Sequence, residues 1–254
     1  MPLTTLMNSV KSTKSMKSLP RASLLALLLG GAGGTALAQE AWGYKYTHGF
    51  YSMADSHYAQ DANLRLNKDD QVIWIGHYWN PSIYQQTRAG YEHTIATAWG
   101  QLTPSLQIAS GGFVSGALSG QVGSTNYLIW GIDRTNDKDY YNLNFDPNNA
   151  ITLGVGTKAM SGAVLSAFTT QTYRLGLGQR ITHLVWRQSL EDKRRLTVDL
   201  AYKHGREAPD ASKVHGTSLV VTYDFDRYFV RAGRDLKVNF SQDNQTRIAA
   251  GLRF

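Results

Sequence analysis

Seven histidines are the side chains in this sequence with the chemistry of a catalytic base. They are His48, His57, His77, His93, His183, His204 and His215. A catalytic base must lie within hydrogen-bond distance of a nucleophile, and on a strand the residue two positions later lies on the same face. The second residue after each histidine is never serine. Ser56 and His57 are adjacent and would point to opposite faces of a strand, and Ser189 lies about 20 Å beyond His183 along a strand. Catalysis is therefore the weaker hypothesis, although residues from different strands can still meet.

Metal-binding patterns are absent from the sequence, which has no cysteine, no HExxH and no EF-hand loop. The segment Asp146-Pro147-Asn148-Asn149 offers oxygen ligands for calcium. However, proline fixes φ and asparagine tolerates left-handed backbone, so a turn is predicted there. Gly154-Val155-Gly156 does not lead into a helix and is not a nucleotide-binding loop. We expect no metal and no cofactor.

Charged side chains recur within segments whose other face is apolar. The residues predicted to face a lumen are Lys45, Arg65, Arg88, Glu92, Arg195, Asp199, Lys203, Arg231 and Arg247. Unpaired charge in a dry core is too costly, so both signs together indicate a wet lumen or a paired network. The excess of basic residues would favour anions in an open lumen. The equally open alternative is an ion-pair network that plugs a narrow barrel. Its members would be Arg195, Asp199, Lys203, Arg231 and Asp235.

The segments that carry these residues are predicted to be β-strands. Residues 246–254, for example, place Ile248, Leu252 and Phe254 on one face, with small or charged side chains between them. The same period of two occurs in 195–203 and 217–225, and few windows have the spacing of an amphipathic helix.

A soluble β-sandwich also alternates, so the connections must distinguish it from a barrel. Segments 190–193 and 224–227 have the length of tight turns, whereas 205–214 and 241–245 are longer and polar, as expected when one rim faces the periplasm. Several aromatic residues lie near strand ends, which suits an interfacial girdle. They include Trp42, Tyr44, Tyr202, Tyr223, Phe225, Tyr228 and Phe254.

We therefore predict an all-β chain that forms a single antiparallel transmembrane β-barrel. About 12 strands are favoured, within a range of about 10 to 14. One candidate strand begins near Tyr140, and the Gly- and Ser-rich stretch 94–123 leaves the count ambiguous.

The first 38 residues resemble a secretory signal peptide. Lys11, Lys14, Lys17 and Arg21 precede any acidic residue, an apolar run begins at Ala22, and Ala36-Leu37-Ala38 forms an A-x-A site. The formal charge of +7 owes four charges to this segment, and the remaining 22 basic and 19 acidic residues give no sign of a nucleic-acid partner. We expect residues 1–38 to direct export and residues 39–254 to form the barrel.

The last residues, Arg247 to Phe254, resemble the closing strand of Gram-negative outer-membrane β-barrel proteins, because the chain ends on phenylalanine after apolar residues at every second position. The resemblance implies that Phe254 is an assembly signal recognised by the barrel-assembly machinery. It also implies the outer membrane as location and outer-membrane lipid as partner.

The favoured function is a small channel with a basic, polar lumen that passes small solutes. Two alternatives stay open. One is an enzyme that modifies lipid A or phospholipid as a hydrolase or acyltransferase, and the other is a structural or surface-binding barrel.

Overall fold

Strands form where side chains alternate between apolar and polar, and the computed structural model describes them in residues 42–53, 57–81, 84–141, 143, 146–159 and 161–254. The predicted signal peptide, residues 1–38, lies outside this part. The described elements are β1 (Gly43–Met53), β2 (Tyr58–Lys68), β3 (Gln71–Asn80), β4 (Tyr84–His93), β5 (Ile95–Thr97), β6 (Gly100–Ala109), β7 (Phe113–Gly123), β8 (Asn126–Thr135), β9 (Ala150–Lys158), β10 (Ala163–Thr172), β11 (Arg180–Ser189), β12 (Arg195–Gly205), β13 (Val214–Phe225), β14 (Tyr228–Asp235), the 3-10 helix η1 (Val238–Phe240) and β15 (Gln245–Arg253).

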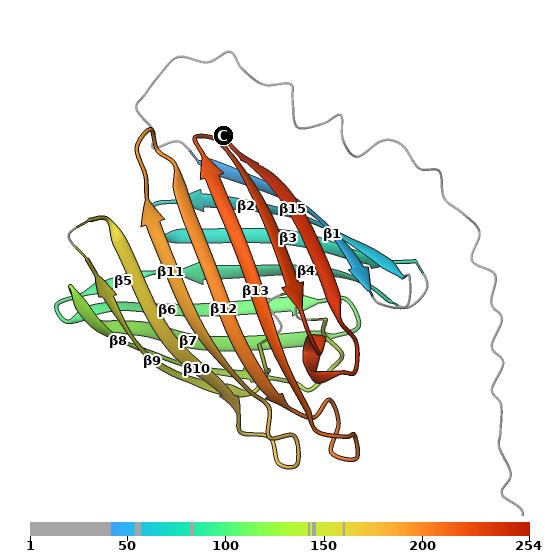
Figure 1. Cartoon of the computed structure of the whole chain (residues 1–254). Helices are drawn as coiled ribbons and strands as arrows, with labels where there is room; N and C mark the ends of the chain where they lie inside the picture. The colour runs from blue at the N-terminus through green and yellow to red at the C-terminus, as the bar shows by residue number, and fades with distance from the viewer. Residues whose placement is uncertain (1–41, 54–56, 82–83, 142, 144–145, 160) are drawn as a thin grey trace, which may run out of the picture. The chain divides into compact units, whose positions relative to one another are not determined.

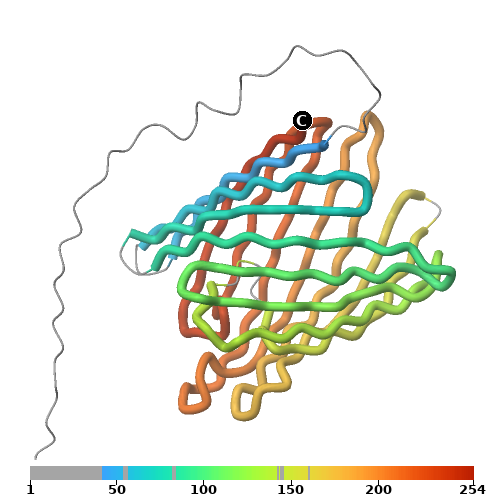
Figure 2. Tube along the Cα trace, turned by 180° about the vertical axis from the view of Figure 1, so that it is seen from behind, coloured from blue at the N-terminus to red at the C-terminus, as the bar shows by residue number. Residues whose placement is uncertain are grey.

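The strands close into one antiparallel ring (Figure 1). Each strand pairs with the next in sequence, except that β4 and β5 both pair with β6. The first strand β1 pairs with the last strand β15, from Lys45 and Arg253 to Met53 and Gln245. Seen from behind, the blue and red ends of the chain run side by side in Figure 2. The ring leaves no long free edge within the described part, which confirms the predicted single antiparallel barrel.

β4 and β5 act as one strand of this ring. Arg88 of β4 pairs with Ala109 of β6, and Ile95 of β5 pairs with Leu102 of β6 in the same register. Pro104 lies between these pairs and has no N–H to donate, which explains the interruption. The fifteen strands therefore make a ring of fourteen, at the upper limit of the predicted range, and the favoured number of about 12 is wrong.

Two segments were assigned wrongly from the sequence, and their effects on the strand count offset each other. β7 (Phe113–Gly123) is a full strand, although its many Gly and Ser residues hide the alternation. Conversely, the strand predicted to begin near Tyr140 does not exist in the described part, because residues 136–149 form the connection between β8 and β9.

The barrel wall is apolar on its outer face and largely polar on its inner face, the reverse of the arrangement in a soluble protein. Large apolar side chains face outward and stay exposed, for example Leu106 at 64%, Leu153 at 63% and Ile248 at 61%. Such a continuous apolar exterior requires an apolar solvent. Inward positions combine aromatic residues with charge, and Lys203 and Phe229 are almost fully buried. Among the described residues, no helix is long and apolar enough to cross a membrane.

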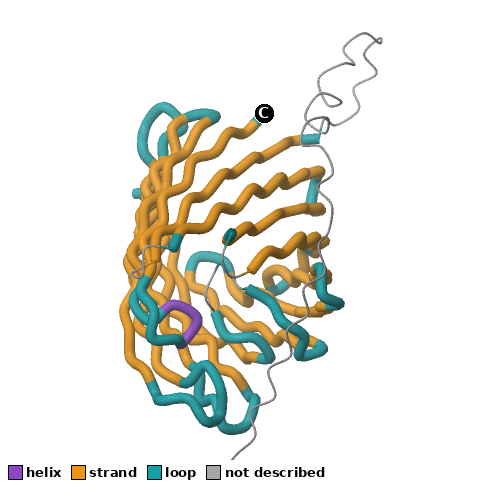
Figure 3. The backbone as a smooth tube through the Cα atoms, turned by 90° about the vertical axis from the view of Figure 1, so that its right-hand side faces the viewer, coloured by secondary structure: helices purple, strands orange, loops and turns teal. Residues whose placement is uncertain are grey.

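The two ends of the ring also differ, and Figure 3 shows more loop backbone at one of them than at the other. The turn end carries both Tyr44 and Phe254, whose rings stack at 5.4 Å, together with connections of two to five residues. The loop end carries connections of three to fourteen residues, of which 136–149 is the longest.

Candidate functional site

The connection between β8 and β9, residues 136–149, is named the lumen loop from here on, and its described residues, 136–141, 143 and 146–149, include several that contact the barrel interior. Counting around the ring, β15 is seven strands from β8 in either direction, so it lies on the opposite wall. The guanidinium of Arg247 on β15 nevertheless donates to the Leu143 carbonyl at 3.0 Å, and Gln245 Nε2 donates to the Tyr141 hydroxyl at 3.2 Å. Tyr141 and Leu143 of the lumen loop therefore reach across the interior to the opposite wall.

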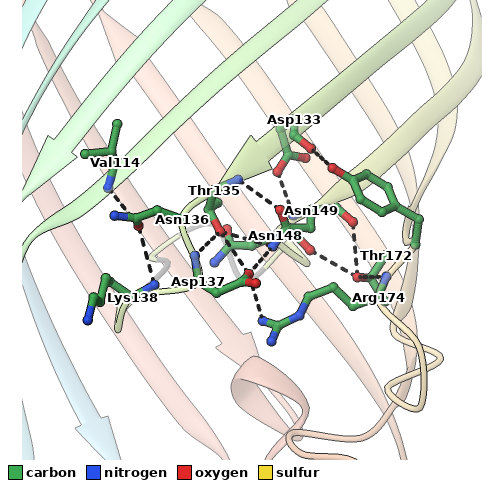
Figure 4. A network of polar contacts seen from close by, with 11 residues as sticks. Val114, Asp133, Thr135, Asn136, Asp137, Lys138, Asn148, Asn149, Thr172 and Arg174 are labelled. Atoms are coloured by element: carbon green, nitrogen blue, oxygen red, sulfur yellow. Dashed lines mark hydrogen bonds and ion pairs between the residues drawn. The ribbon is translucent and has the colours of Figure 1, made fainter.

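A polar network fixes both ends of the lumen loop (Figure 4). Asn149 is its centre: its backbone N–H donates to Asp133 at 2.8 Å, and its side-chain oxygen accepts from the Thr135 N–H at 2.9 Å. Asn149 Nδ2 donates to Thr135 Oγ1 at 3.0 Å and to Asp137 at 2.7 Å. Asn149 has a φ of 53°, in the left-handed region that asparagine tolerates better than most residues. The hydrogen bonds of Asn149 thus hold the first and last residues of the loop together.

A second layer ties this network to the next hairpin. The Thr172 hydroxyl donates to the carbonyl of Asn149 at 3.2 Å, and Arg174 forms an ion pair with Asp137 at 3.3 Å. Figure 4 shows both residues beside the ends of the loop. The loop therefore leaves the wall in a defined direction.

Within the lumen, the loop packs by an aromatic stack and by backbone hydrogen bonds. The ring of Tyr141 stacks on Tyr78 of β3 at 4.4 Å. Gln86 of β4 donates to the Asp139 carbonyl at 3.1 Å and accepts from the Tyr141 N–H at 3.3 Å. Arg88 of β4 donates to the Tyr141 carbonyl at 3.4 Å. Burial raises the pKa of the Tyr141 hydroxyl above its usual range, so it remains protonated at neutral pH.

The lumen loop separates two spaces. Above it, at the loop end, is a vestibule of about 590 Å³ that Tyr84, Tyr141 and Asp243 help to line. Below it is an inner chamber of about 340 Å³, whose lining includes Leu143 and Tyr51. Tyr140 borders both spaces. A ring of fourteen strands is wide enough to hold water, and the loop divides that space.

Six of the nine residues that the sequence assigns to a lumen line the inner chamber. They are Lys45, Arg65, Arg88, Glu92, Arg231 and Arg247. Three of them have carboxylate partners: Arg65 contacts Glu92 at 2.7 Å, Arg88 forms a buried pair with Asp61, and Arg247 contacts Asp235 at 3.3 Å. No ion pair joins Lys45 or Arg231 to a carboxylate in the described part of the chain. Lys45 instead lies 4.7 Å from the ring of Phe229, and Arg231 donates to Thr222 at 3.1 Å.

The other three residues take positions in the wall of β12. Arg195 contacts Asp224 at 3.1 Å near the turn end, and Asp199 and Lys203 border a gap of about 20 Å³. Asp199 accepts from His183 rather than pairing with Arg195 or Lys203 along its own strand. The expected network, which joined Arg195, Asp199 and Lys203 to Arg231 and Asp235 of a later segment, differs in its partners. Arg195 pairs with Asp224, Asp235 pairs with Arg247, and Asp61 and Asp224 are members that the sequence did not single out.

His183 has a carboxylate near each of its two ring nitrogens, and this geometry does not suit a general base. Its Nδ1 lies 2.9 Å from Asp199 and its Nε2 lies 3.1 Å from Asp146 of the lumen loop. Phe168 stacks on the imidazole at 4.8 Å. Both ring nitrogens are therefore occupied by carboxylates, and neither is left to activate a nucleophile. Asp146, considered as a possible calcium ligand in the sequence, serves here to anchor the loop.

Sequence reasoning missed the lumen loop because its contacts join distant segments. Tyr141 and Gln245 are 104 positions apart, as are Leu143 and Arg247. One signal was available: Asp146-Pro147-Asn148-Asn149 is a strong turn sequence directly after the supposed strand from Tyr140, and a membrane strand needs about 9 to 11 residues. The segment was therefore too short to cross.

No family model matches the chain, and no curated protein sequence is significantly similar to it. Solved structures do share its fold. The Acinetobacter baumannii outer membrane protein Omp33 aligns over 84% of this chain and 98% of its own, with a TM-score of 0.58 and 10% identity. A mutant of the Rh. blastica porin aligns over 84% of this chain and 99% of its own, with a TM-score of 0.50 and 8% identity. The chain thus has the porin-like β-barrel fold of outer-membrane proteins, and this fold with its apolar outer wall indicates the outer membrane as its location.

Proposed function

We propose that this protein is an outer-membrane channel for small polar solutes, with a preference for anions. The lumen loop sets its narrowest section, the vestibule faces the cell exterior, and the turn end faces the periplasm. The vestibule and the inner chamber, each large enough for many water molecules, support this proposal, because a fully packed barrel would leave no such space for a solute.

The preference for anions rests on one observation, the two uncompensated cations Lys45 and Arg231 in the inner chamber. Each of the other basic residues that line that chamber has an acidic partner, so its charge is largely offset. Fixed positive charge in a narrow section attracts anions and repels cations. The vestibule carries the opposite excess, with five acidic and two basic residues, and lies on the other side of the loop.

Reversal potentials in planar bilayers test this proposal. Under a KCl gradient, the parent protein should show a higher permeability for chloride than for potassium, most clearly at low salt where screening is weak. The double variant Lys45→Gln/Arg231→Gln should lower the ratio of chloride to potassium permeability to one or below. Arg180→Gln is the matched control, because Arg180 lies on the outward face of β11 and contacts Gln171 there.

Two results would overturn parts of the proposal. A parent protein that inserts but never conducts would indicate that the lumen loop plugs the barrel and that the protein has a structural role. A channel that prefers cations, with no change in the double variant, would show that the vestibule carboxylates control selectivity instead.

A further inference from the structure

The outer wall carries a groove of about 880 Å³ that a channel would not use. Its volume falls within the range of about 300 to 1,000 Å³ that is common for small-ligand sites. Its apolar lining comes mainly from Leu106, Leu118, Ile132 and Ile151, all of which point outward and are at least one-third exposed. The groove therefore opens to the lipid and not to the lumen.

A missing side chain creates the groove. Strand pairing places Tyr91, Leu106, Gly116 and Arg134 in one row across β4, β6, β7 and β8. Gly116 leaves a gap in this row, and a Cβ atom there would meet only Leu106, at 3.6 Å. The neighbouring row, from Leu118 through Ile132 to Ile151, forms the adjacent wall. The result is an apolar trough bounded on one side by an arginine.

Arg134 gives the trough a charged end. It is exposed and lies one residue before the end of β8 at the loop end, and its side chain makes no hydrogen bond or ion pair with any residue that the structure describes. Tyr173 completes this end, and its hydroxyl donates to the Asp133 carbonyl at 2.9 Å. A guanidinium whose donors are free, beside apolar surface at the membrane boundary, suits a phosphate that carries acyl chains.

The charges on the outer wall support the same assignment. Among outward positions of the described strands, four carry formal charge at neutral pH and none is acidic. Lys68 is at the turn end, whereas Arg134, Arg180 and Arg234 are at the loop end. Arg180 and Arg234 contact Gln171 and Thr246, so Arg134 is the arginine both free of such contacts and next to the groove.

We propose that this groove binds lipid A, with an acyl chain over Gly116 and a phosphate on Arg134. The assignment rests on the orientation in the proposed function, which puts the loop end in the outer leaflet, where lipid A is the phosphorylated lipid. It does not depend on conduction, because every groove side chain named here points away from the lumen.

Native mass spectrometry of the detergent-solubilised protein tests the site. The parent is incubated with bisphosphorylated lipid A, with lipid A stripped of its phosphates, or with phosphatidylglycerol. We expect one retained lipid A per barrel, and at least about tenfold weaker retention after Arg134→Gln, as for a lost charged hydrogen bond. Gly116→Leu should weaken retention by filling the trough, and Arg234→Gln should match the parent.

Heat-modifiable mobility in gels shows whether each variant is folded. If Gly116→Leu fails to fold, Gly116→Ala and the Arg134 variant decide the question. Equal losses for Arg134→Gln and Arg234→Gln, equal retention of dephosphorylated lipid A, or equal retention of phosphatidylglycerol would each overturn the assignment. Bilayer conductance of the same variants should equal that of the parent, so failure of the channel proposal is recognised separately.

Discussion

Replacing Asn149 should release the lumen loop and open the channel. Asn149→Ala removes three side-chain hydrogen bonds, with the Thr135 N–H, the Thr135 hydroxyl and Asp137. At about 0.5 to 1.5 kcal/mol each, their loss costs about 1.5 to 4.5 kcal/mol. Alanine at a φ of 53° adds about 1 to 2 kcal/mol. Asn149→Gly removes the same bonds without this strain, so it separates the two contributions.

Single-channel recording measures the effect. Since about 1.4 kcal/mol changes an equilibrium tenfold, a cost of about 3 kcal/mol raises the population with a released loop about a hundredfold. We expect a larger mean conductance and more frequent transitions to a wide level for Asn149→Ala, and a smaller change of the same kind for Asn149→Gly.

Asn244→Ala is the matched control. Asn244 accepts from the Lys237 N–H at 3.0 Å in a different connection of the loop end, so its loss should leave conductance unchanged. If folded Asn149→Ala and Asn149→Gly both conduct as the parent does, then either the lumen loop does not limit the current or Asn149 does not hold it, and the reasoning from Figure 4 fails.

Three further predictions concern stability and assembly. Arg88→Met should destabilise the barrel by about 3 to 5 kcal/mol in urea unfolding from vesicles, because it leaves the carboxylate of Asp61 buried without its partner. The double variant with Asp61→Asn should recover most of this loss, and Arg194→Met, which breaks an exposed pair, should cost less than about 1 kcal/mol. Phe254→Ala should lower the amount of heat-modifiable protein in the outer membrane severalfold, while Phe254→Tyr, which keeps the aromatic stack at the closing seam, stays near the parent level; equal amounts of the two would contradict a role for the ring. Gly251→Ala should shift the urea midpoint downward by an amount equivalent to about 1 to 3 kcal/mol, since its Cβ would lie 2.1 Å from the ring of Phe229 and 2.4 Å from the backbone oxygen of Tyr46; an unchanged midpoint would show that both the ring and the backbone can move aside.

The fold followed from the sequence where local alternation was clean. The segments that include Leu196 and Ile248 have strict period two, and they are strands with the expected faces. The count failed at β7, where Gly116 and Gly120 occupy outward positions that normally carry the apolar signal. A glycine on the outer wall removes the signal for a strand without removing the strand.

The site was harder to foresee than the fold. Period two places Lys45, Arg88 and Arg231 on the polar face, but it does not say which charges meet. The pairing of Arg88 with Asp61 depends on the register of β2 with β3 and of β3 with β4. The position of the lumen loop depends on contacts with the opposite wall of the barrel, and a local sequence pattern cannot predict contacts between such distant segments.

Closure of the ring between β1 and β15 has a consequence for how the molecule comes together. Lys45 pairs with Arg253, which is 208 positions later in the chain, so the seam forms only after almost the whole barrel sequence is available. Contacts of such long range make folding slow, and until the seam forms both edge strands can pair with other chains. The same seam holds the backbones of Tyr44 and Phe254 together through hydrogen bonds of 2.6 and 2.9 Å. A short linker between these two positions, with new ends cut into a connection such as 206–213, should therefore give a circular permutant that keeps the barrel and moves both ends to the opposite side of the membrane.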